Sequence, residues 1–459
     1  MSQQNYFIKQ ALLNDGWANN VHLRINNTGV ITRLEKNTQI TPNDQHLGTV
    51  VPGLVNCHSH SFQRSIAGLT EYQVSAADTF WSWRDTMYQH ANALNPDQLE
   101  AISAYLYTEM LKQGYTSVAE FHYLHHQPGG QPYSSISQLS ESIINAANTS
   151  GINLTLLPTL YMTSGFKQDG LLNQQKRFGN SLEDYLRLHE DATRHAKNYP
   201  QHQVGCGIHS LRAVPKTALD ELVSHLSRSH STAPIHLHIA EQLKEVEDSK
   251  TFLGKRPVSW LLENYKVDQQ WCLIHATHIN KQETKALAHS GATVGLCPTT
   301  EANLGDGLFP LRDFLDLGGH IAIGSDGNTC TSPLEEMRLL EYGQRLISHR
   351  RNISSDKHQR HTGMSLFSRC RQGGARSIGQ PTGMLQEGCR ADLLVLDDSA
   401  ADLRALPPQF IIDTLIFAPN QLLIKDVMAN GKWYVKDFQS INQVPINTRY
   451  IDTISKLRS

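Results

Sequence analysis

The fold of this chain is constrained most by an alternation of short apolar runs with helical patterns between residues 53 and 325. Strands that alternate with helices are typical of a parallel α/β sheet. One intervening helix is marked at both ends, because Asn95 is a predicted N-cap, Pro96 fits the first helical position and Gly114 is a stop signal. The eight predicted strands are residues 53–60, 116–121, 153–160, 204–209, 234–239, 271–275, 292–297 and 320–325.

Eight strand–helix units predict an α/β fold of the (β/α)8 TIM-barrel type. A doubly wound open sheet is the structural alternative, but it would not gather residues from strands so far apart in the sequence around one point. The residues that can carry chemistry fall at the carboxyl ends of the predicted strands, where TIM barrels place their active sites.

The first predicted strand ends in two histidines separated by one residue, His58 and His60. Side chains at positions i and i+2 of a strand point to the same face, so both imidazoles can reach one metal ion. The chain has 23 histidines, so such a pair also arises by chance. The alternative is a buried histidine pair that is hydrogen-bonded to the backbone. The residues at the other strand ends distinguish this structural role from metal binding.

Three further strands end in residues that can bind a metal or transfer a proton. His238 and Glu241 lie at the end of the fifth predicted strand, His275 ends the sixth, and Asp326 follows the eighth. Three imidazoles and one carboxylate suit zinc or a similar divalent ion and leave room for a water molecule. The sequence therefore predicts a metal site at the carboxyl end of the barrel.

The residues alone leave some of these roles open. His236 shares a face with His238 by strand alternation, so either imidazole could be the ligand. His278 lies near the same strand end as His275. Glu241 could also be a carboxylate that starts a helix.

The two ends of the chain differ from the middle. The first 50 residues contain short β-like segments separated by Asn-rich turns, and a similar sequence pattern occurs after about residue 380. The Asn-Gly pair at 430–431 lies between apolar runs and indicates a hairpin. We expect residues 1–50 and 382–459 to form a composite small β-sandwich domain, and residues 51–381 to form the barrel.

Charge and hydropathy exclude several classes of protein. The 41 basic and 43 acidic residues give a net charge of −2, so nothing favours binding to nucleic acid or to a membrane surface. The polar start of the chain lacks the apolar core of a signal peptide, and no apolar stretch is long enough to span a bilayer. The seven cysteines have neither zinc-finger spacing nor the density of a disulfide framework. We expect a cytoplasmic protein with reduced thiols.

Taken together, these motifs resemble the amidohydrolase superfamily, in its single-metal deaminase branch. The resemblance is carried by the histidine pair, the His-x-x-Glu spacing at 238–241, His275 and the Ser-Asp turn at 325–326, and residues 383–393 resemble the segment with which that superfamily re-enters its β domain. Residues 58–64, 79–84 and 121–126 further resemble the deiminases that act on N-formimino-L-glutamate in histidine degradation. The resemblance spans nearly the whole chain.

The resemblance implies a set of site residues with one zinc ion per chain, and it favours His238 over His236 and His275 over His278. Asp326 would take a proton from the attacking water, Glu241 would protonate the leaving nitrogen, and His275 would position the water. The implied metal ligands are His58, His60, His238 and Asp326; the implied catalytic residues are Glu241, His275 and Asp326; and the implied substrate-binding residues are Gln63, Arg84, Tyr123, His209 and Arg212.

The implied reaction is the hydrolytic deimination of N-formimino-L-glutamate to N-formyl-L-glutamate and ammonia. Arg84 and Arg212 suit this small dicarboxylate, because a guanidinium is a planar, permanently charged partner for a carboxylate. Arg84 could instead pair with an acid on its aromatic-rich helix. We interpret Trp81 and Trp83 as packing residues of the core or of a lid.

Three other functions are compatible with a metal site of this kind. A nucleobase deaminase acting on guanine or cytosine would share every metal residue, but a flat neutral base does not call for two arginines. A binuclear hydrolase commonly needs a bridging, carbamylated lysine on strand four, and residues 152–162 contain none. A non-enzymatic, metal-binding relative would not need Glu241. Association into a homodimer is an expectation from the resemblance alone.

Overall fold

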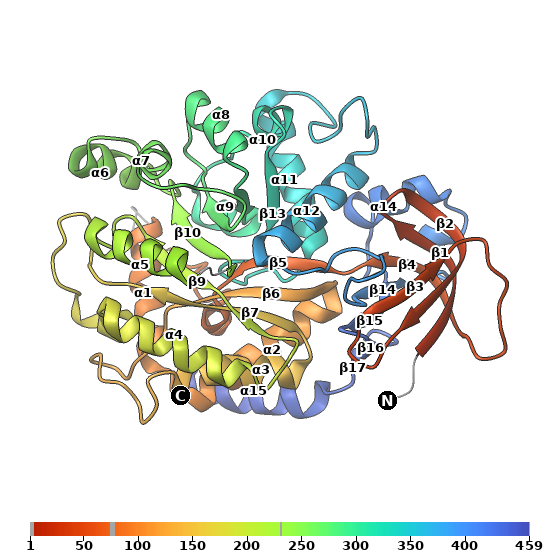
Figure 1. Cartoon of the computed structure of the whole chain (residues 1–459), viewed down its shortest axis with the longest axis horizontal. Coiled ribbons are helices and arrows are strands. Elements are labelled where there is room, and N and C mark those ends of the chain that lie inside the picture. Colours follow the sequence, from red (N-terminus) through yellow and green to blue (C-terminus); the bar gives the residue numbers. More distant parts are fainter. Residues whose placement is uncertain (1–3, 74–78, 230–231, 459) are drawn as a thin grey trace.

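The computed structural model describes residues 4–73, 79–229 and 232–458 (Figure 1). A barrel of parallel strands lies on the left of Figure 1, and a second sheet built from both termini lies on the right. This arrangement confirms the predicted fold class.

The barrel contains the eight predicted strands in sequential order. The predicted strand 204–209 is wrong in one respect, because it is divided at Gly205. The N–H of Gly205 donates to Leu156 O at 2.8 Å, whereas the N–H of Cys206 donates to Pro234 O at 2.8 Å, so the chain changes its pairing partner between them. A short β8 (Gln203–Val204) therefore precedes the barrel strand. The barrel strands are β5 (Leu54–Ser59), β6 (Tyr115–His122), β7 (Asn153–Leu160), β9 (Cys206–Ser210), β10 (Ile235–Ile239), β11 (Trp271–His275), β12 (Thr293–Leu296) and β13 (His320–Ile323).

Asp326 joins the last barrel strand to the first. Its N–H donates to His58 O at 3.0 Å, and its carbonyl oxygen accepts from the N–H of His60 at 3.0 Å. Asp326 has a φ of 44°, in the left-handed region that non-glycine residues seldom adopt. The segment that closes the barrel therefore also delivers a predicted metal ligand.

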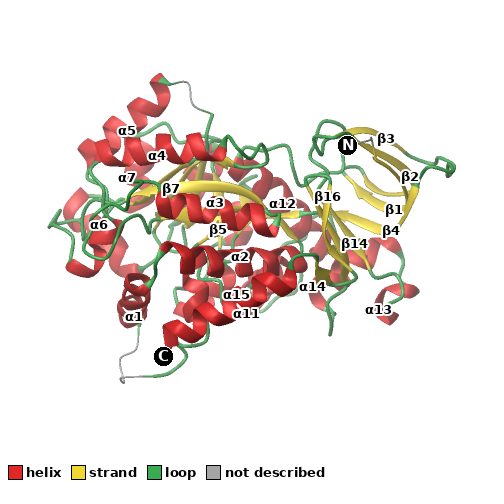
Figure 2. Cartoon of the chain, turned by 90° about the horizontal axis from the view of Figure 1, so that it is seen from below, coloured by secondary structure: helices red, strands yellow, loops and turns green. Residues whose placement is uncertain are grey.

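Helices surround the barrel strands (Figure 2). The helix predicted from its end signals is confirmed as α2 (Pro96–Gln113), with a capping box between Asn95 and Gln98 and with Gly114 in the left-handed conformation. The other helices before residue 380 are η1 (Ser61–Ile66), α1 (Phe80–Ala93), α3 (Gln138–Ser150), η2 (Asn173–Phe178), α4 (Leu182–Ala196), α5 (Lys216–Arg228), α6 (Leu243–Leu253), α7 (Pro257–Asn264), α8 (Lys281–Ser290), α9 (Pro298–Leu304), α10 (Leu311–Asp316), α11 (Pro333–Ser348) and α12 (Thr362–Ile378).

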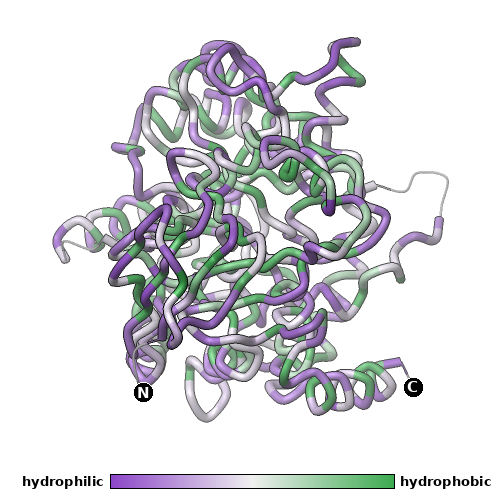
Figure 3. Tube along the Cα trace, turned by 90° about the vertical axis from the view of Figure 1, so that its right-hand side faces the viewer, coloured by the Kyte–Doolittle hydropathy of each residue, from purple (hydrophilic) through white to green (hydrophobic). Residues whose placement is uncertain are grey.

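Among the described residues, the second sheet has eight strands in the order β17-β16-β15-β14-β4-β1-β2-β3. The pairing of β14 with β4 joins the two ends of the chain. Hydrophobic and hydrophilic residues alternate along the strands nearest the N-terminus in Figure 3, as expected for a sheet with one buried face. These strands are β1 (Gln4–Leu13), β2 (Gly16–Ile25), β3 (Ile31–Glu35), β4 (Gln45–Pro52), β14 (Leu393–Leu396), β15 (Ile424–Ala429), β16 (Lys432–Lys436) and β17 (Gln439–Ser440).

This sheet folds over its own apolar core. β1 and β16 are four positions apart in the strand order, yet the rings of Tyr6 and Trp433 have centroids 6.0 Å apart, and the indole N–H donates to Tyr6 Oη at 3.1 Å. Strands that far apart in a flat sheet would be separated by nearly 20 Å. The predicted hairpin lies between β15 and β16, with positive φ at both Asn430 and Gly431.

The remaining helices follow β14 in the chain. They are α13 (Ala401–Arg404), η3 (Pro408–Phe410), α14 (Ile411–Phe417) and α15 (Gln443–Arg458). α15 packs on α2 of the barrel, where Tyr450 stacks on Tyr105 with ring centroids 3.9 Å apart. The domain limits after residues 50 and 381 stay a prediction. No helix in the described ranges is long and apolar enough to cross a membrane.

Candidate active site

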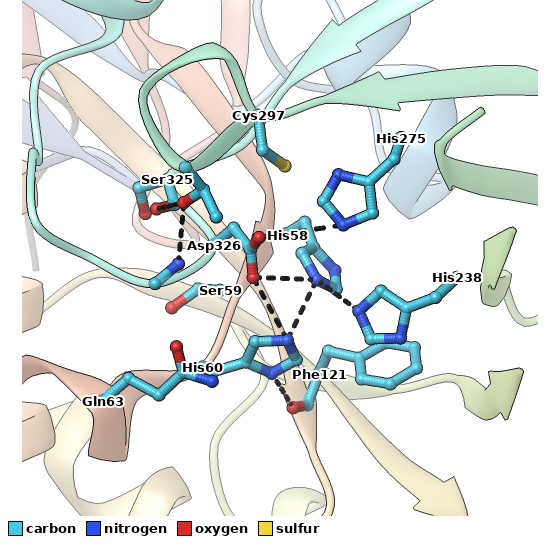
Figure 4. Close-up of polar contacts among 12 residues, drawn as sticks. His58, Ser59, His60, Gln63, Phe121, His238, His275, Cys297, Ser325 and Asp326 are labelled. Carbon is cyan, nitrogen blue, oxygen red and sulfur yellow. Dashed lines mark hydrogen bonds and ion pairs between the residues drawn. The ribbon is translucent and has the colours of Figure 1, made fainter. Parts of the chain in front are cut away.

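The four predicted metal ligands meet at the carboxyl ends of the barrel strands (Figure 4). The Nε2 atom of His58 lies 3.2 Å from Nε2 of His60 and 2.9 Å from Nε2 of His238. Oδ1 of Asp326 lies 3.2 Å from His60 Nε2 and 3.5 Å from His58 Nε2. All four side chains are buried. We call this group the His–Asp cluster.

Backbone carbonyls fix the rings of two of these histidines. The Nδ1 atom of His60 lies 2.8 Å from Phe121 O, and that of His238 lies 2.9 Å from His209 O. Because a carbonyl only accepts, each Nδ1 carries the proton and each Nε2 presents a lone pair. This second hydrogen bond is the usual way in which proteins orient histidine ligands of a metal.

The ionisation states of the His–Asp cluster suit a cation. Burial lowers the pKa of His58 to about 3 and also lowers the pKa values of His60 and His238, which favours neutral imidazoles. Burial alone would raise the pKa of Asp326, but the neighbouring histidines hold it well below its usual range. Lone pairs of unprotonated nitrogens only about 3 Å apart repel one another unless a cation lies among them. The donor set of three nitrogens and a carboxylate fits zinc or a similar divalent ion.

Glu241 and His275 lie beside the His–Asp cluster, and both are buried. Glu241 Oε1 is 3.8 Å from His275 Nε2, which is 3.7 Å from Asp326 Oδ2. Burial, with the charges of Asp326 and Glu245, raises the pKa of Glu241 to about 7. Burial opposes the charging of His275, but Glu241, Glu301 and Asp326 outweigh it and raise the pKa of His275 to about 10.

The structure places the two alternative histidines away from this group. His236 Nε2 lies 2.8 Å from Ser377 O at the end of α12. The side chain of His278 does not line the pocket beside the His–Asp cluster. The residues favoured by the family resemblance, His238 and His275, are the ones that the fold brings together.

All five predicted substrate-binding residues line one pocket with His60, His238, Glu241, His275 and Asp326. The pocket encloses about 500 Å³ of empty space, including its open mouth. Besides Arg84, helix α1 contributes four residues to the wall that the sequence analysis did not assign to the site. The predicted members are Gln63, Arg84, Tyr123, His209 and Arg212, and the further members on α1 are Phe80, Trp83, Met87 and Tyr88.

Among the described residues, no carboxylate forms a direct ion pair with either arginine of the pocket. Within the described ranges, neither Arg84 nor Arg212 has a carboxylate oxygen within 4.0 Å of its guanidinium nitrogens. The guanidinium of Arg84 lies instead over the rings of Trp81 and Tyr88, with its central carbon 4.6 Å and 5.4 Å from their centroids. The pocket therefore offers two positive groups to an anionic ligand.

Three residues near the site escaped the sequence analysis. Glu245 accepts from the N–H groups of Ala240 and Glu241, both at 3.0 Å, and so fixes the turn that carries Glu241. Glu301 Oε1 lies 3.3 Å from His275 Nδ1. Potential ligand atoms of Cys297, His275 and Asp326 lie within 4.8 Å of one another, which makes them an alternative metal group. Cys297 ends a predicted strand, so the reasoning applied to the other strand ends could have found it.

Comparison with known proteins identifies the family of this chain. The family model described as the amidohydrolase family matches residues 49–434. This chain belongs to the amidohydrolase family. A second model, for the N-terminal domain of formimidoylglutamate deiminase, matches residues 4–47 of this amidohydrolase. The family expected from the sequence is confirmed.

Full-length relatives of this amidohydrolase are similar in sequence and in structure. Formimidoylglutamate deiminase of Pseudomonas aeruginosa is 43% identical over 451 residues, covering 98% of this chain and 99% of the relative. The crystal structure of an amidohydrolase from Brucella melitensis superposes with a TM-score of 0.94 at 40% identity, covering 99% of this chain and all of that one. A zinc-bound adenosine deaminase from Xanthomonas campestris shares the fold, with a TM-score of 0.81 at 18% identity over 99% of this chain and 98% of that one.

Proposed function

We propose that this amidohydrolase hydrolyses N-formimino-L-glutamate to N-formyl-L-glutamate and ammonia, a cytoplasmic step of histidine degradation that uses one zinc ion per chain. The observation that carries the proposal is that one pocket joins the His–Asp cluster and Glu241 to two arginines, neither of which has a carboxylate oxygen of the described residues within 4.0 Å of its guanidinium nitrogens. The full-length similarity to formimidoylglutamate deiminase of Pseudomonas aeruginosa supports the same substrate.

The His–Asp cluster would hold the zinc ion through the three Nε2 atoms and the carboxylate of Asp326. When bound, such an ion supplies a water that loses its proton near neutral pH. The residues around it then have to position the substrate and move protons.

The arginines hold the substrate by its two carboxylates, since a guanidinium can bind a carboxylate through two parallel hydrogen bonds. Tyr123 and Gln63, whose Oη and Nε2 atoms lie 3.2 Å apart, add neutral polar contacts. His209 lines the same pocket. Two charged contacts fix the formimino carbon over the His–Asp cluster, and this placement is the main requirement for attack by water.

Proton transfer falls to Asp326 and Glu241. The water oxygen forms a bond to the formimino carbon while Asp326 accepts a proton. Glu241, whose pKa near 7 allows both protonation states, delivers protons to the terminal nitrogen. Glu241 takes up these protons, one from Asp326 and one from the new hydroxyl group, so the terminal nitrogen gains both protons of the water. The bond between the formimino carbon and this nitrogen then breaks, the nitrogen leaves as ammonia, and the oxygen stays in the N-formyl group. His275 stabilises the negative charge that develops on the oxygen.

A panel of substrates tests this assignment. Ammonia release is measured for N-formimino-L-glutamate, guanine and cytosine with zinc-loaded protein at one enzyme concentration. The proposal expects turnover of the first substrate alone. Turnover of a base would make the protein a nucleobase deaminase, and the absence of turnover with all three would favour a non-enzymatic metal-binding relative.

Homodimer formation stays a prediction, which analytical ultracentrifugation tests.

A further inference from the structure

Glu301, in the first turn of helix α9, is a buried acid that faces His275. Its Oε1 atom lies 3.3 Å from His275 Nδ1 and accepts from the N–H of Cys297 at 3.0 Å. Its side chain lines no part of the pocket and belongs to none of the metal-binding groups found among the described residues. Glu301 therefore contacts the site through the imidazole of His275.

The backbone at His275 explains why this imidazole needs an anchor. His275 and Ala276 have φ values of 68° and 48°, so two consecutive non-glycine residues lie in the left-handed region. Such conformations cost on the order of 1 kcal/mol each and persist only where the surroundings hold them. The N–H of Ala276 donates to Ile239 O at 3.0 Å, which ties this turn to β10. These bonds fix the backbone, but they leave the ring free to rotate about its side-chain torsions.

We propose that Glu301 is a positioning residue that holds the ring of His275 in its working orientation. Because a carboxylate accepts the Nδ1 proton, the ring presents Nε2 to Glu241 and Asp326, at 3.8 Å and 3.7 Å. A ring turned over would present carbon atoms to both acids. This inference rests on the proposed function, in which His275 stabilises charge on the reacting oxygen.

Glu301 variants separate this role from a structural one. Loss of the outer hydrogen-bond partner of a metal-ligating histidine typically costs 10–100-fold in metal affinity or activity, and we take the same range for the activity that depends on the ring of His275. We expect Glu301→Ala to lower kcat by about 100-fold and Glu301→Gln by about 10-fold, because the amide oxygen can still accept the proton. KM and zinc content should stay within about twofold of the parent values, since Glu301 touches neither substrate nor cluster. A loss that appears in KM or in zinc content would overturn the proposal.

A double-mutant cycle with His275→Asn shows whether Glu301 acts through the imidazole. If it does, Glu301→Ala lowers kcat in the parent protein but causes no further loss in the His275→Asn background. An equal loss in both backgrounds would contradict the proposal. Glu341→Gln is the matched control, because Glu341 is also a buried carboxylate and accepts from Ile353 N and Ser354 N outside the site. It should leave kcat unchanged.

Proton NMR of protein labelled with ¹⁵N-histidine gives a readout that does not depend on activity. A hydrogen-bonded imidazole N–H of His275 should give a downfield resonance that disappears in His275→Asn and in Glu301→Ala and persists in Glu341→Gln. Persistence of that resonance in Glu301→Ala would overturn the proposal. If the parent protein does not turn over N-formimino-L-glutamate, the proposed function fails, while this spectrum still decides whether Glu301 holds the ring.

Discussion

The carboxylate of Glu241 lies 3.8 Å from the Nε2 atom of His275, although the two residues come from the ends of different barrel strands. Both groups border the His–Asp cluster and face the same pocket. Burial brings the pKa of Glu241 to about 7, so this carboxyl group can both give and accept a proton near neutral pH. The pair is therefore placed to handle protons next to an activated water.

Replacing Glu241 by Gln should lower kcat by at least about 100-fold, the usual contribution of a positioned proton donor. Zinc content should not change, because Glu241 is outside the His–Asp cluster. Steady-state kinetics and metal analysis of the same preparation test this, with Glu247→Gln on the exposed face of α6 as the control. A Glu241→Gln variant that keeps its zinc and most of its kcat would exclude Glu241 from the proton transfer.

Removal of the metal by a chelator should abolish turnover and lower the melting temperature, because an ion that binds only the folded protein stabilises it. At a free zinc concentration of 100 times Kd, the stabilisation would be about 2.7 kcal/mol. Added zinc should restore both properties. The Asp326→Asn variant, which lacks one ligand of the His–Asp cluster, serves as a comparison. Chelation should lower its melting temperature less than that of the parent protein. Full activity after complete removal of metal would contradict the assignment of the His–Asp cluster.

Replacing either pocket arginine by Met should lower kcat/KM for N-formimino-L-glutamate by roughly 30-fold or more, equivalent to about 2 kcal/mol for a lost buried charge contact. N-formiminoglycine, which lacks the side-chain carboxylate, shows which arginine binds which end. One of the two arginines would bind the side-chain carboxylate that this analogue lacks. Replacing that arginine should hardly change kcat/KM for N-formiminoglycine relative to the parent protein. If both variants lose equally with both compounds, the arginines do not divide the carboxylates between them.

The sequence was sufficient to predict the parts of the site that depend on regular structure. The carboxyl ends of parallel strands meet at one face, so His58, His238 and Asp326 could be brought together from their positions at strand ends. The helix α2 was predictable because Asn95 and Gly114 are local signals that act within one turn.

Other features depend on contacts that no local pattern encodes. The contact of Glu301 with His275 joins the end of one strand to a helix 26 residues further along the chain, next to a turn in the left-handed conformation. The division of a strand at Gly205 reflects a change of hydrogen-bond partner between neighbouring strands. The contact of Tyr6 with Trp433 depends on the curvature of the whole terminal sheet.

The buried carboxyl group of Glu120 should make stability depend on pH. Its Oε1 accepts from the N–H of Ser61 at 2.5 Å, and burial raises its pKa from 4.5 to about 7. Because the folded-state pKa is the higher one, ionisation costs more in the folded protein. The penalty grows between pH 4.5 and 7 and is constant above that range.

Glu120→Gln removes this titration and keeps an acceptor for Ser61. The free energy of unfolding of the variant relative to the parent protein should increase by about 2 kcal/mol from pH 5.5 to pH 8. Urea denaturation of both proteins at the two pH values measures the change. Parallel curves for the two proteins would show that Glu120 has an ordinary pKa in the fold.

The identity of the products from N-formimino-L-glutamate tests the central claim most directly. Zinc-loaded protein is incubated with this compound, and ammonia, N-formyl-L-glutamate, formamide and glutamate are measured together. The proposed chemistry predicts equal amounts of ammonia and N-formyl-L-glutamate and no formamide. Formamide with glutamate would mean that the other C–N bond is cut, and it would contradict the proposed leaving group.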